Sequence, residues 1–273
     1  MNPLSMCEKI EISCENLVVQ AQGSVGLVIL NRPERRNALS AEMWAAIPEA
    51  MKALEARDEI RVIILRGAGQ EAFAAGADIS EFGENRQSGA MAKQYEQRNQ
   101  EALAAIRNSV KPTLAMIHGF CIGGGLAIAL ACDIRLAAQG ASFALPPAKL
   151  GLAYPFEGLR QVLAIIGVAR AKEMIFTARR ISADEAIVLG LVQHVFANDQ
   201  LEAETLKMAE MIAANAPLSI RAAKAMLNAL SDDPAKMNLA EMEGLAAACF
   251  DSEDYREGRA AFLEKRKALF KGH

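Results

Sequence analysis

Short apolar runs rich in β-branched residues recur along the first half of the chain. They occupy residues 17–20, 25–30, 61–67, 113–119 and 133–139. Runs of this length and composition are typical of strands buried on both faces of a sheet. Turn-forming residues follow two of them, because Asn31 and Pro33 come after one run and Gly67 and Gly69 close another. We therefore expect a largely buried sheet in this half.

Between these runs, apolar residues recur at the three- and four-residue steps of a helix. After Ser40, which is placed to cap a helix, this spacing joins Met43, Trp44, Ile47, Met51 and Leu54. Pro48 is a candidate kink in that helix. Residues 91–107 show the same period, and the small residues of 125–133 suit a buried helix. Repeated strand, glycine loop and helix units predict an α/β fold with a mostly parallel sheet and right-handed crossovers.

The pattern changes from about Glu157, where strand signals nearly vanish apart from residues 192–196. Ser182 and Glu185 have the spacing of a capping box, and Gly190 lies where that helix is expected to stop. Further helices are predicted at 199–215, 217–230, 234–250 and 254–269. The last helices are apolar enough to pack against another chain. We expect a core at 1–200 and a helical oligomerisation region at 201–273.

Composition excludes several classes of protein. The 273 residues are 52% hydrophobic and 23% charged with a net charge of −3, so no basic face for nucleic acid is expected. No apolar stretch is long enough to span a membrane, and charged residues such as Glu8 and Lys9 occupy the place of a signal sequence, so we expect a cytoplasmic location. The five cysteines are scattered and odd in number, which indicates reduced, mostly buried thiols and no metal site.

Two glycine loops, 73–82 and 118–127, each follow a predicted strand. Glycine lets a backbone approach a ligand closely, and a loop that leads into a helix exposes unpaired N–H groups. Alternatively, Gly123, Gly124 and Gly125 only permit tight packing of helix on strand. The loops lack the spacing of a phosphate-binding loop, a dinucleotide fingerprint or a hydrolase nucleophile elbow. An oxyanion hole for a thioester remains, in which each N–H donor is typically worth ~3 kcal/mol.

Four motifs then identify a family resemblance: "NRPERRNALS", "FAAGADISEF", "IGGGLAIALACDI" and "EGRAAFLEKRKALFKGH". Together they resemble the enoyl-CoA hydratase/isomerase (crotonase) family over residues 25–273. The resemblance implies a spiral of ββα units with a helical C-terminal trimerisation region, assembled as a homotrimer or a dimer of trimers. It also implies an acyl-CoA substrate, no separate cofactor, and an oxyanion hole made by the N–H groups of Ala77 and Gly124.

The resemblance implies CoA-binding positions as well. Ala38, Leu39, Ala75, Asp78 and Ile79 match positions that hold the pantetheine and adenine of CoA in the family. Two C-terminal positions, Phe262 and Lys265, match residues that can reach the CoA of a neighbouring subunit.

The chain departs from the family pattern at the two glutamates of the hydratases, whose positions hold Ala127 and Pro147. Neither side chain can carry a proton. "PPAKLGLAYPFEG" resembles the methylmalonyl-CoA decarboxylase branch, which also has proline at position 147 and tyrosine at Tyr154. Decarboxylation of a malonyl-type thioester needs the oxyanion hole and no general base. That branch, however, has histidine where this chain has Ala77 and glutamate where it has Ala127.

Several alternatives stay open at this stage. Glu157 could replace the missing glutamates in a hydratase or isomerase, or it could be a solvated surface charge. Tyr154 could orient the departing carboxylate or supply a proton, or its ring could simply be packed. Asp78 and Glu81 are weaker acid candidates. The chain could also be a subunit that binds acyl-CoA without catalysis.

Overall fold

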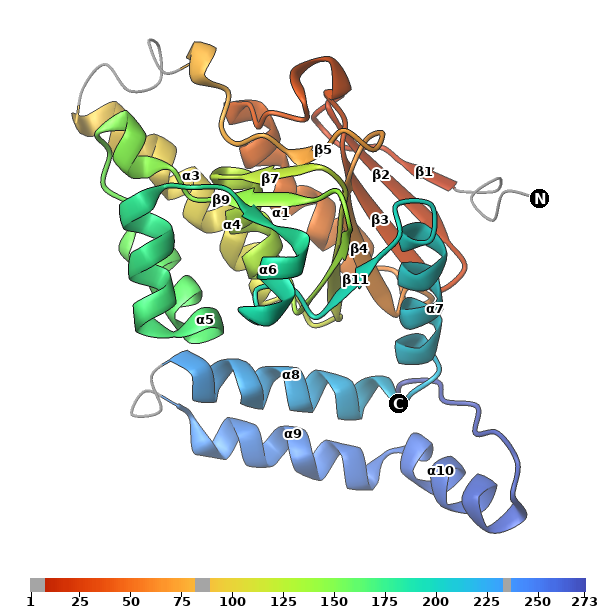
Figure 1. Ribbon diagram of the computed structural model, residues 1–273. Helices are drawn as coiled ribbons and strands as arrows, with labels where there is room; N and C mark the ends of the chain where they lie inside the picture. Colours follow the sequence, from red (N-terminus) through yellow and green to blue (C-terminus); the bar gives the residue numbers. More distant parts are fainter. Residues whose placement is uncertain (1–7, 82–88, 233–236) are drawn as a thin grey trace.

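A computed structural model describes residues 8–81, 89–232 and 237–273 (Figure 1). Its larger sheet has the strand order β1-β2-β3-β4-β6-β8-β11. The bounds are β1 Glu8–Ile10, β2 Leu17–Gln22, β3 Val25–Leu30, β4 Val62–Gly67, β6 Thr113–Ile117, β8 Ile134–Ala138 and β11 His194–Phe196. The first three strands pair antiparallel, and β3, β4, β6, β8 and β11 pair parallel. The predicted strands and the α/β class are therefore confirmed.

A second, smaller sheet takes two of its strands from the predicted glycine loops, 73–82 and 118–127, and two from segments where no strand was predicted. Its order is β10-β9-β7-β5, and β5, β7 and β9 are parallel neighbours. The bounds are β5 Ala72–Ala74, β7 Phe120–Ile122, β9 Ser142–Ala144 and β10 Ile181–Ser182. Strands of two or three residues are too short to show a period of two, so the prediction of loops alone was wrong there.

Helices cover the two sheets and enclose the main core between them. The bounds are α1 Ala41–Glu55, α3 Gly89–Arg107, α4 Gly124–Ala131, α5 Phe156–Thr177 and α6 Ala183–Val188, with short 3₁₀ turns η1 Pro33–Arg35, η2 Ile79–Glu81 and η3 Pro147–Leu150. Ser40 caps α1 as predicted, because its hydroxyl accepts the Met43 N–H at 3.2 Å, and α1 continues through Pro48. Trp44, Phe73 and Phe143 are the largest fully buried side chains of the core.

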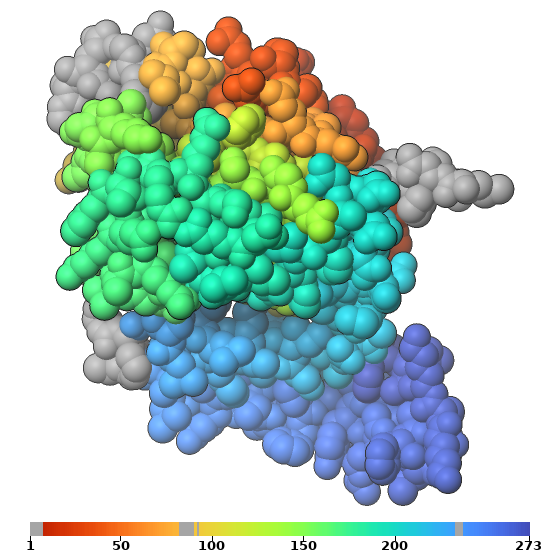
Figure 2. All heavy atoms as spheres, in the orientation of Figure 1, coloured from red at the N-terminus to blue at the C-terminus, as the bar shows by residue number. Residues whose placement is uncertain are grey.

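The C-terminal quarter is helical, with α7 Leu201–Ala213, α8 Pro217–Asp232, α9 Leu239–Asp251 and α10 Glu253–Glu264. Helix α7 packs on the outer face of the larger sheet. Helices α8, α9 and α10 form an arm along one side of the core, drawn in blue in Figures 1 and 2. The helix predicted at 254–269 ends at Glu264, because Lys265 adopts a left-handed conformation with φ 54°. The predicted start at Pro234 falls outside the described residues.

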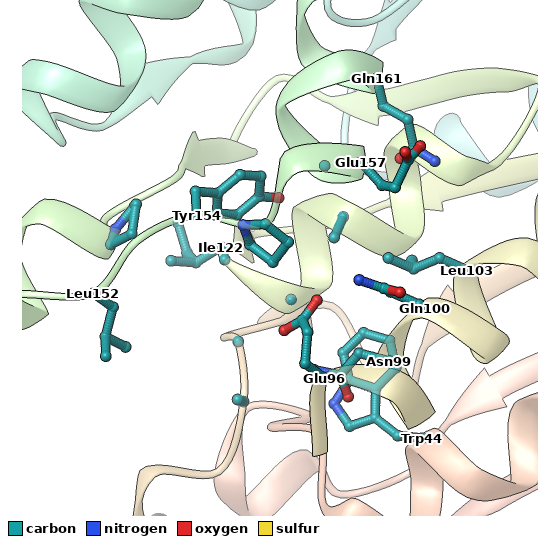
Figure 3. Close-up of a pocket in the computed structure, with 18 of the residues that line it drawn as sticks. Trp44, Glu96, Asn99, Gln100, Leu103, Ile122, Leu152, Tyr154, Glu157 and Gln161 are labelled. Carbon is teal, nitrogen blue, oxygen red and sulfur yellow. The ribbon is translucent and has the colours of Figure 1, made fainter. Parts of the chain in front are cut away.

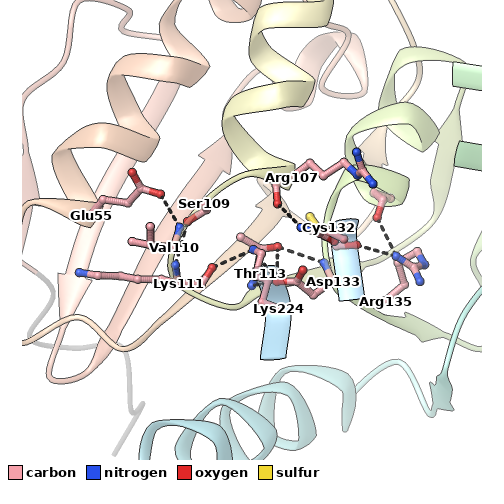
Figure 4. Close-up of polar contacts among 12 residues, drawn as sticks. Glu55, Arg107, Ser109, Val110, Lys111, Thr113, Cys132, Asp133, Arg135 and Lys224 are labelled. Atoms are coloured by element: carbon pink, nitrogen blue, oxygen red, sulfur yellow. Dashed lines mark hydrogen bonds and ion pairs between the residues drawn. The ribbon is translucent and has the colours of Figure 1, made fainter. Parts of the chain in front are cut away.

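Polar contacts hold α8 against the core (Figure 4). The buried Lys224 ammonium forms an ion pair with the Asp133 carboxylate at 2.8 Å and donates to the Lys111 carbonyl at 3.0 Å. The same Asp133 oxygen accepts the backbone N–H of Thr113 at 2.7 Å. Asp133 therefore links the start of β8, the start of β6 and the arm. No helix in the described ranges is long and apolar enough to cross a membrane.

Candidate active site

A cavity of about 760 Å³ opens between α3, the start of α4, the loop after β5 and residues 146–161 (Figure 3). The predicted catalytic positions Ala77, Gly124, Tyr154 and Glu157 all line it. Of the predicted CoA positions, Ala75 and Ile79 line it too. Residues from widely separated parts of the sequence therefore meet around one space.

The parallel pairing of β5 and β7 places the two glycine loops side by side. Ala74 lies opposite Cys121 in the register, so the segments that follow β5 and β7 leave the small sheet at the same end of the strands. One continues to Ala77, and the other enters α4 at its first residue, Gly124. A Cβ added at Gly124 would lie 3.6 Å from the backbone nitrogen of Ala77. The two predicted N–H donors are therefore neighbours.

Neither N–H group has a partner among the backbone hydrogen bonds of the described residues. The bonds on either side of Ala77 use its neighbours, because Leu39 donates to the Gly76 carbonyl at 2.8 Å and Asp78 donates to the Leu39 carbonyl at 2.9 Å. Gly124 lies in the first turn of α4, where N–H groups have no partner within the helix. The geometry leaves two adjacent donors at the wall of the cavity, at the positive end of a helix.

At one of the three glycines, the structure supports the alternative that glycine permits tight packing of helix on strand. A Cβ at Gly125 would lie 2.4 Å from the Ala74 carbonyl oxygen, so glycine is needed there for helix α4 to approach β5. Gly123 adopts φ 54°, which glycine allows without strain. The glycine cluster thus serves close packing and donor placement together.

The opposite end of α4 is stabilised by a buried cation. The Arg135 guanidinium donates to the carbonyls of Cys132 at 2.8 Å, Leu191 at 2.8 Å and Ala129 at 3.3 Å (Figure 4). Burial lowers the pKa of Arg135. A positive charge at a helix C-terminus offsets the negative end of the helix dipole. Arg135 therefore secures the helix whose first turn presents Gly124.

The two hydratase positions, Ala127 and Pro147, both line the cavity. Side chains in the described part of the wall that can carry a proton come from other elements: Glu96 of α3, Tyr154, and Glu157 of α5. The side chains of the described wall that can carry a proton therefore do not lie at positions 127 and 147.

Tyr154 precedes α5 and directs its ring into the cavity (Figure 3). The ring packs on Gly158, where an added Cβ would lie 2.6 Å from the Tyr154 Cε1 atom. Burial, with a smaller contribution from the charge of Glu96, raises the pKa of Tyr154. The phenol therefore stays protonated at neutral pH and can act as a hydrogen-bond donor.

Glu157 lies in the first turn of α5 at the cavity wall. Its carboxylate forms an ion pair with Arg160 at 2.8 Å, and 53% of its side chain is exposed. Arg160 also pairs with Asp232 of the arm. The Glu157 side chain thus lies at the cavity wall, and its carboxylate already has the Arg160 guanidinium as its partner.

The sequence analysis missed Glu96, Asn99 and Gln100, which line the cavity from one face of α3 (Figure 3). Their spacing of three and four residues, continued by Leu103, was the available signal. The wall also contains buried polar atoms without a hydrogen-bond partner in the described structure, namely Trp44 Nε1, Asn99 Oδ1 and Gln161 Oε1.

Three other predicted CoA positions, Ala38, Leu39 and Asp78, are not among the residues that line the cavity. Leu39 is fully buried, and Ala38 offers its carbonyl to Arg32 at 3.0 Å. Arg32 also forms an ion pair with the buried Asp78 at 3.0 Å. Hydrogen bonds from Ser80, followed by the charge of Arg32, lower the pKa of Asp78. Asp78 therefore fixes the loop that carries Ala77.

The two C-terminal CoA positions do not reach the cavity of their own chain. Phe262 in α10 is 84% exposed, and Lys265 ends that helix. The weaker acid candidate Glu81 accepts the Ala41 N–H at 2.8 Å and so helps to cap α1. The described part of the chain holds no group of three or more metal-binding side chains.

The enoyl-CoA hydratase/isomerase family matches residues 20–273. Over 92% of this chain and 96% of its own length, the short-chain-enoyl-CoA hydratase of Clostridium acetobutylicum is 34% identical. The methylmalonyl-CoA decarboxylase of Escherichia coli is 36% identical over 91% of this chain and 95% of its own. A solved enoyl-CoA hydratase/carnithine racemase from Magnetospirillum magneticum is 40% identical, with a TM-score of 0.92 over 96% of this chain and 97% of that one.

Proposed function

Because this chain belongs to the enoyl-CoA hydratase/isomerase (crotonase) family, we propose that it stabilises the enolate of a short-chain acyl-CoA between the N–H groups of Ala77 and Gly124. The chain is a crotonase-family acyl-CoA enzyme with the predicted crotonase fold. The observation that carries the proposal is a pair of adjacent N–H groups at one cavity wall that have no backbone partner within residues 8–81, 89–232 and 237–273.

The reaction that this site favours is malonyl-type decarboxylation, which makes the enzyme a lyase. The bond between the α-carbon and the carboxylate breaks, CO₂ leaves, and the electron pair becomes the enolate whose oxygen accepts both N–H groups. A proton then binds the α-carbon and gives the shortened thioester. The step needs no general base, which agrees with Ala127 and Pro147 at the hydratase positions. Tyr154, which lines the cavity, is assigned to orient the carboxylate or to donate the proton.

The CoA portion is assigned to the loop side of the cavity. Ala75 and Ile79 line this side, and Ala38, Leu39 and Asp78 support it from behind. Phe262 and Lys265 are assigned to the CoA of a neighbouring copy, since both are exposed on the arm. This assignment requires a homotrimer or a dimer of trimers, with 201–273 as the oligomerisation region. CoA enters as part of the substrate.

A second candidate is hydration or isomerisation with Glu157 as the acid/base, because Glu157 reaches the cavity wall. The argument against it is that the Glu157 carboxylate is held in an ion pair with Arg160 and that 53% of its side chain is exposed. A non-catalytic acyl-CoA-binding subunit is the third alternative.

The test is turnover of methylmalonyl-, malonyl- and crotonyl-CoA by the purified full-length protein, followed by mass spectrometry. We expect CO₂ loss from a malonyl-type thioester and the same rate for Glu157→Gln. Hydration of crotonyl-CoA that disappears in Glu157→Gln would replace decarboxylation by the second candidate. Binding of these thioesters without any product would leave the third candidate, the non-catalytic acyl-CoA-binding subunit.

A further inference from the structure

One face of α3 borders the cavity, and three of its four residues there are polar. Glu96, Asn99, Gln100 and Leu103 follow each other at helical spacing, and all four line the cavity (Figure 3). Glu96 is half-buried, and its carboxylate points toward the middle of the cavity, across from Tyr154. The negative charge of Glu96 helps to raise the pKa of Tyr154, which agrees with their closeness.

We propose that Glu96 is a further catalytic residue, the carboxyl group that moves a proton to and from the α-carbon of the bound thioester. This inference rests on the proposed function, because it needs the enolate held by Ala77 and Gly124.

The structure favours Glu96 over the other carboxylate in the described wall. Glu157 is exposed over half of its side chain, whereas Glu96 is half-buried. Glu96 comes from α3, which packs against α4, the helix that carries both Gly124 and Ala127. With alanine at position 127, no carboxylate from α4 competes for the space beside the oxyanion donors. A carboxylate from the facing helix can occupy it.

The proton balance is complete without another reactant. In the forward direction, the Glu96 carboxylate takes a proton from water and gives it to the α-carbon of the enolate, the electron pair forms the C–H bond, and the thioester carbonyl is restored. Glu96 is then a carboxylate again, as at the start. In the reverse direction, the Glu96 carboxylate removes the α-proton of a saturated acyl-CoA, and the electron pair moves onto the oxygen held by the two N–H groups.

The reverse step provides a direct test that does not depend on decarboxylation. Wild-type protein is incubated with propionyl-CoA in D₂O, and deuterium uptake at the α-carbon is followed by NMR, with propionyl-CoA affinity measured by calorimetry. The variant is Glu96→Gln, with Glu96→Ala as a second variant should the first fail to fold. Glu101→Gln is the matched control, because Glu101 is exposed on the same helix and does not line the cavity.

We expect Glu96→Gln to slow exchange by at least about 100-fold at unchanged affinity, which is the usual range for losing an acid/base group, while Glu101→Gln exchanges like wild type. Exchange within about threefold of wild type in both Glu96 variants would overturn the inference. Wild-type protein that binds propionyl-CoA but exchanges no proton would also overturn it, while leaving the binding site intact. Absence of propionyl-CoA binding would overturn the proposed function itself, together with the inference.

Discussion

Replacing Gly124 with alanine tests the oxyanion site at its most restricted point. The added Cβ would lie 2.9 Å from Trp44 Cζ2, 3.3 Å from Leu39 Cδ1 and 3.6 Å from the Ala77 nitrogen. Trp44 and Leu39 are buried in the core, so neither can move far. The backbone at position 124 must therefore shift, and the new methyl group stands beside the place where the acyl oxygen meets the Ala77 N–H.

The size of the effect follows from the donor geometry. An oxyanion donor acts over 2.7–3.1 Å, so a shift of a few tenths of an ångström weakens it and a larger shift removes it. Loss of one donor typically costs about 3 kcal/mol of transition-state stabilisation, which corresponds to a roughly 150-fold lower kcat/KM. Interference with the Ala77 N–H by the same methyl group adds to this loss.

The assay is kcat/KM on the accepted thioester, or α-proton exchange with propionyl-CoA, with thermal unfolding as the check on folding. Gly244→Ala is the matched control, because an added Cβ there meets nothing within 4 Å. The control is expected to keep wild-type activity. A folded Gly124→Ala enzyme with activity within threefold of wild type would refute the assignment of this N–H to the oxyanion.

Three further predictions concern stability and reactivity. Asp78→Asn, which breaks the pair with Arg32, is expected to lower the free energy of unfolding by about 2 kcal/mol at pH 7. The pKa of Asp78 is lowered in the folded state, so its contribution to the free energy of unfolding is complete above pH ~4 and is lost as the pH falls through the folded-state pKa. The free energies of unfolding of wild type and variant, measured by urea titration, should therefore converge in acid. A difference that stays constant with pH contradicts this. Burial raises the pKa of Cys132 to about 12, so mass spectrometry should find the half-buried Cys249 alkylated at pH 8 and Cys132 only upon unfolding; equal rates contradict this. Lys224→Met removes the buried cation that holds α8, so limited proteolysis should cut the arm faster than in wild type; unchanged cleavage contradicts this.

The larger sheet and the helices could be predicted because their signals are local. Strand β4 begins with four consecutive apolar residues, 62–65, and α1 shows helical spacing with a capping serine. The small sheet could not be predicted, since β5, β7 and β9 have three residues each and are stabilised by pairing with segments distant in sequence.

That Ala77 and Gly124 lie at one cavity could be predicted for the same reason. Ala77 and Gly124 belong to recognisable motifs, and the fold brings them together through β5 and β7. Glu96 could not be assigned from sequence, because a polar face on a helix normally indicates contact with solvent. Only the packing of α3 beside α4 shows that this face borders a cavity.

The smaller sheet has an evolutionary consequence. The turns that carry Ala77 and Gly124 take their relative position from main-chain pairing of β5 with β7, which is independent of side-chain identity. Mutation can therefore exchange the side chains around the cavity while the two turns keep their relative position. Homologues called hydratase, isomerase and decarboxylase can then diverge from one scaffold by few substitutions. Laboratory conversion should likewise begin at Ala127 and Pro147, with the backbone left as it is.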